Sequence, residues 1–223
     1  MNTQQLLDFL SQLQGNNNKD WMDLNRDRYK QVRADLMCLA ETLLLKMRLI
    51  DSTLGLLRPA DCVFRINRDI RFSKIKNPYK TSMGIYIAKG GKSMPYAGYY
   101  LHLEPCDKSF IAGGLYQPEG AILKGVRQEI DYNGEGLSTI VSNKAFKTSF
   151  GTLKGESLQR MPKGYDEAHP YKDWLKLKSL LAIQPLKDTE VTQPNLIERV
   201  LQGFQTLCPL IQFLNQGIQA DTQ

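Results

Sequence analysis

The sequence predicts an α+β fold with a central, mainly antiparallel sheet flanked by N- and C-terminal helices. Apolar residues recur at helical spacing toward both ends of the chain, and short apolar segments separated by turn residues occupy its middle. With 223 residues, 42% of them hydrophobic and 23% charged, the chain is long enough to bury one sizeable core. We therefore expect a single domain over residues 1–223, helical over 1–58, rich in strands over 59–116 and mixed over 117–223.

The N-terminal part predicts two helices. An apolar stripe from Leu6 to Leu13 indicates a helix over residues 3–14, with Thr3 as its N-cap. Gly15 and the asparagines that follow it end this helix. A second helix is expected over residues 19–49, because its apolar residues follow a period close to 3.6.

The middle of the chain is typical of an antiparallel meander, with Gly90-Gly91 as one of its turns. Its strands are expected over residues 63–72, 85–88, 99–104 and 110–115. Beyond Pro118 the pattern returns to helices, with two further strands. We expect helices at 122–130 and 137–143, a strand at 153–161, a helix that opens at Pro170, a strand at 179–183 and a final helix over 194–214.

Composition argues against several classes of protein. No apolar run approaches the roughly 20 residues of a membrane helix, and the N-terminus lacks the features of a secretory signal, so we expect a cytoplasmic protein without membrane contact. The four cysteines are isolated, which fits a reduced protein better than a disulfide framework. His102 and His169 have no metal-like partner at short spacing, so we expect no metal site and no cofactor.

Nearly all of the charge imbalance lies between Arg58 and Lys92. This segment contains nine Lys and Arg residues and two acidic residues, a net charge of +7, whereas the whole chain has a net charge of +6. The rest of the chain is therefore close to neutral. Such local focusing of positive charge indicates a site for an anion.

The first predicted strand alternates between a polar face and a mostly apolar face. The polar face contains Arg65, Asp69 and Arg71, and we expect Asp69 to stay ionised and to hold the two arginines in one hydrogen-bond network. Arg68 interrupts the apolar face, so it should be partly buried and needs a partner for its charge. That partner is either a carboxylate of the protein, such as Glu104, or the phosphate or carboxylate of a ligand.

The loop after this strand continues the positive charge. It contains Lys76, Tyr79 and Lys80, and Pro78 restricts its backbone. Tyr79 either stacks on a ring of a ligand or fills a gap in the core. Lys80, taken alone, is better explained as a solvated surface residue.

These residues carry a resemblance to a known family. The pattern is Arg65-x-x-Arg68-Asp69-x-Arg71-Phe72, then Lys76-x-x-Tyr79-Lys80-Thr81, with Asn16-Asn17-x-x-x-Trp21, Tyr99-Tyr100-Leu101-His102, Gly113-Gly114-Leu115-Tyr116-x-Pro118, Pro162-Lys163-Gly164-Tyr165 and His169-Pro170 elsewhere. It resembles domain of unknown function 2461, conserved hypothetical proteins found mainly in bacteria and within some longer fungal proteins. Ile75 departs from the family, which has Asp or Asn before the lysine matched by Lys76. The resemblance implies no reaction.

Two other motifs add candidate site residues. Gly113-Gly114 ends a predicted strand before a helix, where backbone N–H groups can meet an anion, although a bulge or tight packing explains such a pair more often. Tyr100, His102 and Glu104 share one strand face and are either acid/base groups or an exposed polar surface. An enzyme of this sequence would use His102 or Asp69 as its acid or base.

Taken together, the residues favour a protein that binds a phosphorylated or carboxylated small molecule at a basic site on the central sheet. The three arginines would bind the anion, Asp69 would orient them, and the lysines and tyrosine of the following loop would close over it. Two alternatives stay open. One is binding of single-stranded nucleic acid on the basic, aromatic segment. The other is a purely structural arginine–aspartate network without a ligand. The sequence leaves the oligomeric state open.

Overall fold

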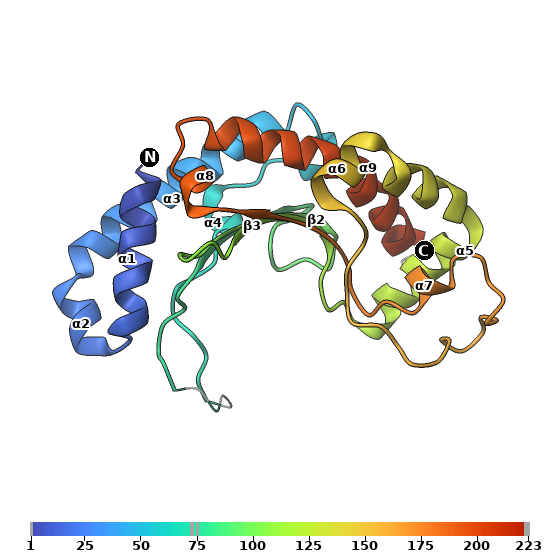
Figure 1. Cartoon of the computed structure of the whole chain (residues 1–223), viewed down its shortest axis with the longest axis horizontal. Helices are drawn as coiled ribbons and strands as arrows, with labels where there is room; N and C mark the ends of the chain where they lie inside the picture. The colour runs from blue at the N-terminus through green and yellow to red at the C-terminus, as the bar shows by residue number, and fades with distance from the viewer. Residues whose placement is uncertain (1, 72–73, 75, 221–223) are drawn as a thin grey trace.

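The computed structural model describes residues 2–71, 74 and 76–220, and the predicted α+β class is confirmed (Figure 1). In chain order the elements are α1 (Thr3–Gly15), α2 (Lys19–Leu24), α3 (Arg26–Met47), the 3-10 turn η1 (Ser52–Leu54), α4 (Pro59–Cys62), β1 (Met83–Ala88), β2 (Gly98–Leu103), β3 (Ser109–Leu115), α5 (Gly120–Ser142), α6 (Lys144–Phe150), α7 (Lys172–Leu175), β4 (Leu180–Leu186), α8 (Asp188–Val191) and α9 (Leu196–Ala220).

The four strands form one antiparallel sheet in the order β1-β2-β3-β4. In its register Tyr86 of β1 pairs with Tyr100 of β2, which pairs with Ala112 of β3, which pairs with Ile183 of β4. Because side chains alternate along each strand, these four residues lie on the same face of the sheet. Their chain neighbours point to the other face.

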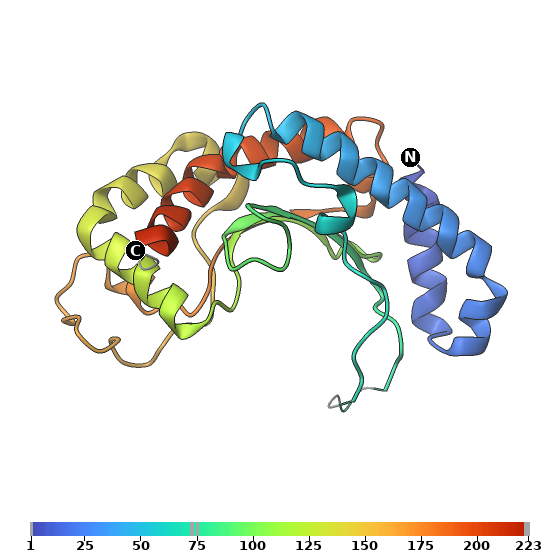
Figure 2. The same cartoon turned by 180° about the vertical axis from the view of Figure 1, so that it is seen from behind.

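Helices cover only one face of this sheet. A Cβ on Gly113 of β3 would lie 2.8 Å from Cδ1 of Leu207 of α9, which shows how closely α9 packs on the strands. Figures 1 and 2 show α3 and α9 on the same side of the sheet, with α5 beside α9. The other face is the concave side of an arch, and none of the described helices crosses it.

Tyr99 of β2 joins the sheet to both groups of helices. It is fully buried, and its ring centroid lies 5.3 Å from that of Phe204 on α9. Its hydroxyl donates a 2.8 Å hydrogen bond to Oδ2 of Asp51, which is 1% exposed and lies between α3 and η1. The other Asp51 oxygen accepts from the backbone N–H and the hydroxyl of Thr53. Burial raises the pKa of Tyr99, so the phenol stays neutral and remains a donor.

The N-terminal helices differ in detail from the prediction. The N-cap of α1 is Asn2, not Thr3, and its side chain accepts a hydrogen bond from the backbone N–H of Gln5. The helix expected over 19–49 is divided into α2 and α3, because the backbone at Asn25 (φ −105°, ψ 18°) is not helical. Farther along, the short helix expected at 137–143 is the end of α5.

Four of the predicted strands are confirmed, at 85–88, 99–104, 110–115 and 179–183, as β1 to β4. The strand expected at 153–161 is wrong, since this stretch makes only single bridges from Lys154 to Leu181 and from Ser157 to Leu177. The helix after Pro170 and the final helix are confirmed as α7 and α9.

The strand expected over 63–72 is wrong for the described part of that segment, and Phe72 lies outside the described residues. Val63 makes one bridge to Ile85 at the edge of the sheet, and Asn67 makes another to Tyr79. Beyond Phe64, whose N–H donates to the Gly84 carbonyl, backbone groups of the segment pair with each other: the Arg68 N–H donates to the Pro78 carbonyl and the Lys80 N–H to the Ile66 carbonyl. Residues 64–71, 74 and 76–80 instead project beside the concave face as what we call the arm (Figure 1).

We predict that Tyr99→Phe lowers the free energy of unfolding by about 1–3 kcal/mol, because one oxygen of the buried Asp51 carboxyl loses its donor. Urea denaturation followed by circular dichroism measures the change. Tyr132→Phe is the matched control, since Tyr132 is 86% exposed, and it should change stability by less than about 0.5 kcal/mol. Equal effects of the two substitutions would contradict the role given to the Tyr99–Asp51 hydrogen bond.

Candidate functional site

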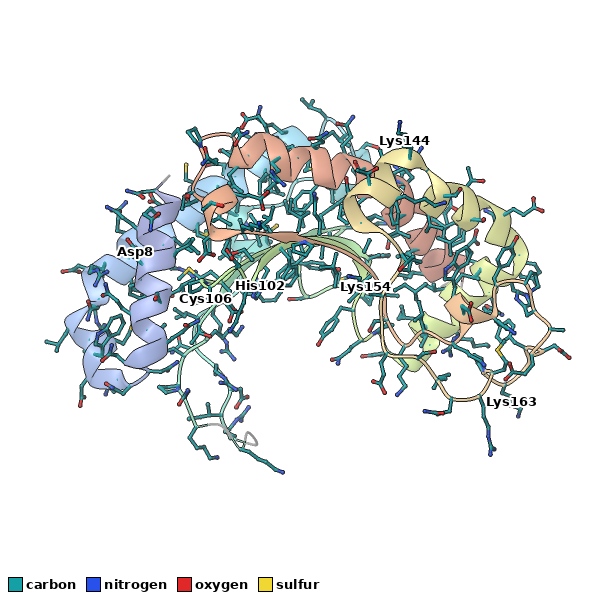
Figure 3. All side chains as sticks on the ribbon, viewed as in Figure 1. Asp8, His102, Cys106, Lys144, Lys154 and Lys163 are labelled. Atoms are coloured by element: carbon teal, nitrogen blue, oxygen red, sulfur yellow. The ribbon has the colours of Figure 1, made fainter. Side chains whose placement is uncertain are left out.

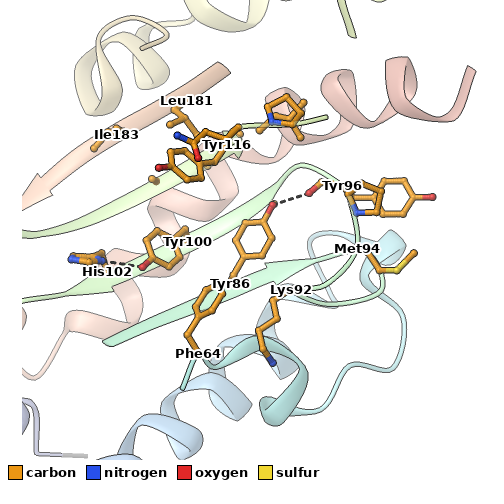
Figure 4. A pocket seen from close by; sticks show the side chains of 18 of the residues that line it. Phe64, Tyr86, Lys92, Met94, Tyr96, Tyr100, His102, Tyr116, Leu181 and Ile183 are labelled. Carbon is orange, nitrogen blue, oxygen red and sulfur yellow. Dashed lines mark hydrogen bonds between the residues drawn. The ribbon is translucent and has the colours of Figure 1, made fainter. Parts of the chain in front are cut away.

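The concave face of the sheet contains a cavity of about 730 Å³, within the usual size range of a small-molecule site. Side chains from β1, β2, β3 and β4 form its floor, and the loops after β1 and β3 form its rim (Figure 4). Aromatic rings dominate the lining. They are Phe64, Tyr86, Tyr96, Tyr100, Phe110 and Tyr116.

Two glycines shape the floor of this cavity. A Cβ on Gly84 of β1 would lie 2.6 Å from Cε2 of Tyr100, and a Cβ on Gly98 of β2 would lie 2.9 Å from Cζ of Tyr86. Real Cβ atoms are not found at such distances, so each glycine provides the space into which a tyrosine ring leans. The two tyrosines are cross-strand partners, and their ring centroids are 6.4 Å apart.

A chain of hydrogen bonds runs along the cavity face of β2. The Tyr100 hydroxyl is 2.9 Å from Nδ1 of His102, and Nε2 of His102 is 2.9 Å from Oε2 of Glu104. Because a carboxylate only accepts, Nε2 donates its proton toward Glu104, and in this tautomer Nδ1 accepts from the Tyr100 hydroxyl. Burial, followed by the charge of Glu104, raises the pKa of Tyr100 to about 12. The phenol is therefore neutral at physiological pH.

His102 is held in a fixed orientation. Its ring stacks on Phe110 of β3 with centroids 4.5 Å apart and planes 14° apart. Its side chain is 15% exposed, and Glu104 also lies 3.9 Å from the Lys108 ammonium. Glu104 thus orients the His102 ring on one side and Tyr100 contacts its other nitrogen. Glu104 is paired to His102 and not to an arginine.

The arm is anchored at its base by backbone and side-chain hydrogen bonds. The N–H of Arg68 donates to the carbonyl of Pro78, and the N–H of Lys80 donates to the carbonyl of Ile66. Asn17, between α1 and α2, binds both backbone polar groups of Tyr79. Its side-chain Nδ2 donates to the Tyr79 carbonyl (3.0 Å), and its Oδ1 accepts from the Tyr79 N–H (3.1 Å). Tyr79 packs against the hydrophobic core, so it fills a gap at the base of the arm.

Three cations of the arm gather next to the cavity. The Lys80 ammonium lies 5.4 Å from the ring centroid of Phe64, which lines the cavity. The pKa of Lys80 is lowered, first by burial and then by the charges of Arg65 and Arg68. Within the residues that the structure describes, none of these three side chains forms a salt bridge with a carboxylate. Arg68 is half-buried, as expected from its place in the sequence.

Farther out on the arm, Arg71 and Asp69 bind each other. The Arg71 guanidinium donates to both Asp69 oxygens, at 3.0 and 2.6 Å, and lowers the pKa of that carboxyl. The two side chains are 77% and 44% exposed, so this pair is solvated. The Lys76 ammonium donates to the Ile70 carbonyl (3.1 Å). Ile75, where the sequence departs from the family pattern, lies outside the described residues.

The Gly113-Gly114 pair lies at the cavity but has a packing explanation. Gly113 faces α9, as described above. Gly114 has a φ of +132° and a Cβ on it would collide with the Leu180 carbonyl of β4. Both positions therefore need glycine for the fold, whatever they contact in a ligand.

His169, the other histidine, lies far along the chain in a different cluster. Its Nε2 is 3.0 Å from Oδ1 of Asp131 on α5, and its Nδ1 accepts from the N–H of Tyr171. These contacts tie the segment before α7 to α5. No group of three or more His, Cys, Asp or Glu side chains in the described part of the chain is arranged to hold a metal ion.

The structure therefore brings part of the expected site together. Tyr100, His102 and the glycine pair line the cavity, whereas the arginines and lysines lie on the arm beside it. Sequence reasoning missed Tyr86, Phe64 and Asn17. Alternation along β1 would have put Tyr86 on the same face as Tyr100, but the contact from Asn17 to Tyr79 spans 62 residues and has no local signal.

Among the helices described here, none has the length and apolar character required to cross a membrane.

Comparison with known proteins identifies a family but no relative of known role. No curated protein and no solved structure matches the chain. One family model does match, described as conserved hypothetical protein (DUF2461), and it covers residues 5–213. The match includes the sheet, the arm and the helices that position them, and the chain belongs to the DUF2461 family of conserved hypothetical proteins.

Proposed function

We propose that this protein binds a phosphorylated or carboxylated small molecule where the arm meets the aromatic cavity. The observation that carries the proposal is the cluster of Arg65, Arg68 and Lys80 beside Phe64, with no carboxylate partner among the described residues. Like charges held close together repel each other, and the pKa of Lys80 is lowered first by burial and then by the charges of Arg65 and Arg68. A bound anion would remove the repulsion and supply the missing partner.

The remaining candidate residues take roles that follow from their positions. Arg71 extends the positive surface along the arm, and Asp69 orients its guanidinium. Lys76 and Tyr79 stabilise the arm, which closes over the anion. Gly113 and Gly114 bring backbone to the cavity wall. His102 is the acid/base group of the cavity, since it is connected to the cavity through the Tyr100 hydroxyl.

Single-stranded nucleic acid is the second candidate, and one observation favours it. The aromatic face of the sheet is open along its concave side, and basic residues lie at both ends of it, on the arm and at Lys163 (Figure 3). Bases can stack on such rings while phosphates follow the basic residues. A small molecule is favoured because the cations cluster at one end of a cavity of limited size.

We predict that a phosphorylated small molecule stabilises the wild-type protein in a thermal-shift screen of orthophosphate, sugar phosphates, nucleotides and organic acids. Saturation at about 100 times the Kd should raise Tm by roughly 5–10 °C. Arg68→Gln should abolish the shift, because it removes a central cation. Arg33→Gln, which removes the same charge from α3, should keep it. Equal shifts in both variants, or none in wild type, would contradict the proposal.

The pH dependence of binding tests Lys80 in particular. Its lowered pKa means that the ammonium loses its proton as pH rises through a value below the usual 10.5. Affinity for the best phosphomonoester should therefore fall at least about twofold between about pH 8, where the ligand is already a dianion, and pH 10.5. Lys80→Arg keeps its charge over this range and should flatten the profile. An unchanged profile in this variant would show that Lys80 does not contact the anion.

The nucleic-acid alternative predicts a different dependence on salt. An oligonucleotide that contacts several phosphates should lose affinity steeply, with a slope of log K against log salt of about −0.7 for each phosphate neutralised. A slope of about −3 or steeper for a 12-nucleotide strand, measured by fluorescence anisotropy, would support this candidate. A slope near that of a single phosphomonoester would favour the small molecule.

A further inference from the structure

The aromatic floor of the cavity shows which kind of molecule the anionic group belongs to. Tyr86 and Tyr100 lean across the strands into the spaces left by Gly98 and Gly84, so both rings rest against the sheet and do not stand upright from it. Figure 4 shows the two rings next to each other on the floor. Rings held in this way have little freedom left to lose when a ligand binds.

The polar ends of both tyrosines are already engaged by the protein. The Tyr86 hydroxyl donates to the carbonyl of Tyr96 at 2.7 Å, and the Tyr100 hydroxyl donates to Nδ1 of His102. Each hydroxyl has used its single proton, so neither is a free donor to a ligand. What the pair offers the cavity is chiefly ring surface, which suits stacking better than recognition of the many hydroxyl groups of a sugar.

The surroundings of the pair leave room for a flat group. In the sheet register Gly98 pairs with Gly114, and Tyr100 pairs with Ala112, so the floor next to the tyrosines is made of very small residues. At the rim Tyr116 is 68% exposed, an unusual exposure for a large aromatic side chain that lines a cavity. A planar ring lying over this floor would cover apolar surface on several sides.

The stacking surface and the cations are connected through one residue. Phe64 lies 6.2 Å from Tyr100, centroid to centroid, and its ring lies 5.4 Å from the Lys80 ammonium. A molecule that stacks on the tyrosines and extends past Phe64 would therefore present its far end to Lys80 and the two arginines next to it. The charge of that end must be negative.

From this geometry we infer that the ligand is a nucleotide-like molecule, with a planar ring that stacks on Tyr86 and Tyr100 and a phosphate that binds Arg65, Arg68 and Lys80. The inference rests on the proposed function and narrows its ligand to anions that carry an aromatic ring. The cavity volume of about 730 Å³ accommodates one such molecule, and the clustering of the cations at one end fits one phosphate group.

Isothermal titration calorimetry with AMP, GMP, CMP, UMP, ribose 5-phosphate and orthophosphate tests the inference. At least one nucleotide should bind about tenfold or more tightly than ribose 5-phosphate, because stacking on an aromatic side chain contributes roughly this much or more. Tyr100→Leu removes the ring and should weaken that nucleotide by about tenfold while leaving ribose 5-phosphate unchanged. Tyr100→Phe keeps the ring and should bind the nucleotide nearly as well as wild type.

Two further variants separate stacking from damage to the fold. Tyr86→Leu should act in the same direction as Tyr100→Leu, whereas Tyr132→Leu, at an exposed tyrosine of α5, should have no effect on either ligand. Each variant is first compared with wild type by circular dichroism and thermal melting. A Tyr100→Leu protein that melts like wild type and still binds the nucleotide at full affinity would overturn the inference.

The outcomes also distinguish a failure of the nucleotide inference from a failure of the proposed anion site. Suppose that ribose 5-phosphate binds as tightly as every nucleotide and that Arg68→Gln abolishes the binding of both. Stacking on the tyrosines is then wrong, and the anion site stands. If no phosphate compound binds but an organic acid does, the nucleotide inference is wrong and the anion site stands. If neither phosphates nor organic acids bind, both are wrong. If a 12-nucleotide strand binds far more tightly than any mononucleotide and with a steep salt dependence, a single nucleotide is not the ligand, and the nucleic-acid candidate replaces it.

Discussion

The one-sided cover of the sheet is the constraint on which the rest of this structure depends. Tyr99 points to the covered side, where it packs on Phe204 of α9 and donates to the buried Asp51. That contact joins the N-terminal helices, the sheet and the last helix in one core. Because this core is complete on one side, the opposite face does not need a second layer of helices. On that face, side chains of the sheet itself must cover the strands, because no described helix does so.

The open face meets this requirement with its own side chains. Tyr86 and Tyr100 lie over glycines of neighbouring strands, and Phe110 covers one side of His102. The polar atoms among these rings are paired within the face, since each tyrosine hydroxyl has an acceptor and His102 has Glu104. The rings of this surface are apolar, and the polar atoms named here are already hydrogen-bonded. The surface is therefore suited to a flat ligand for the same reasons that make it stable without one.

Much of the fold can be predicted from the sequence, because it depends on local pattern. Alternation and turn residues identify β1 to β4, and helical spacing identifies α1 and α9. The failures also have physical causes. Residues after Val63 alternate like a strand, but beyond Phe64 backbone groups of the segment pair with one another, from Arg68 to Pro78 and from Lys80 to Ile66, so they form the arm. The site was harder to predict, since contacts that place the cations beside the cavity, among them Phe64 with Tyr100 and Asn17 with Tyr79, are long-range.

The arm and the sheet are two separate structures whose relative position decides the chemistry of the site. Positive charge alone would attract any anion, and aromatic rings alone would attract any flat molecule. Asn17 fixes the base of the arm through both polar groups of the Tyr79 backbone, and Phe64 lies near both Tyr100 and Lys80. These contacts hold the cations at a defined distance from the rings. The selectivity of the site should therefore come from the spacing between charge and ring more than from either feature alone.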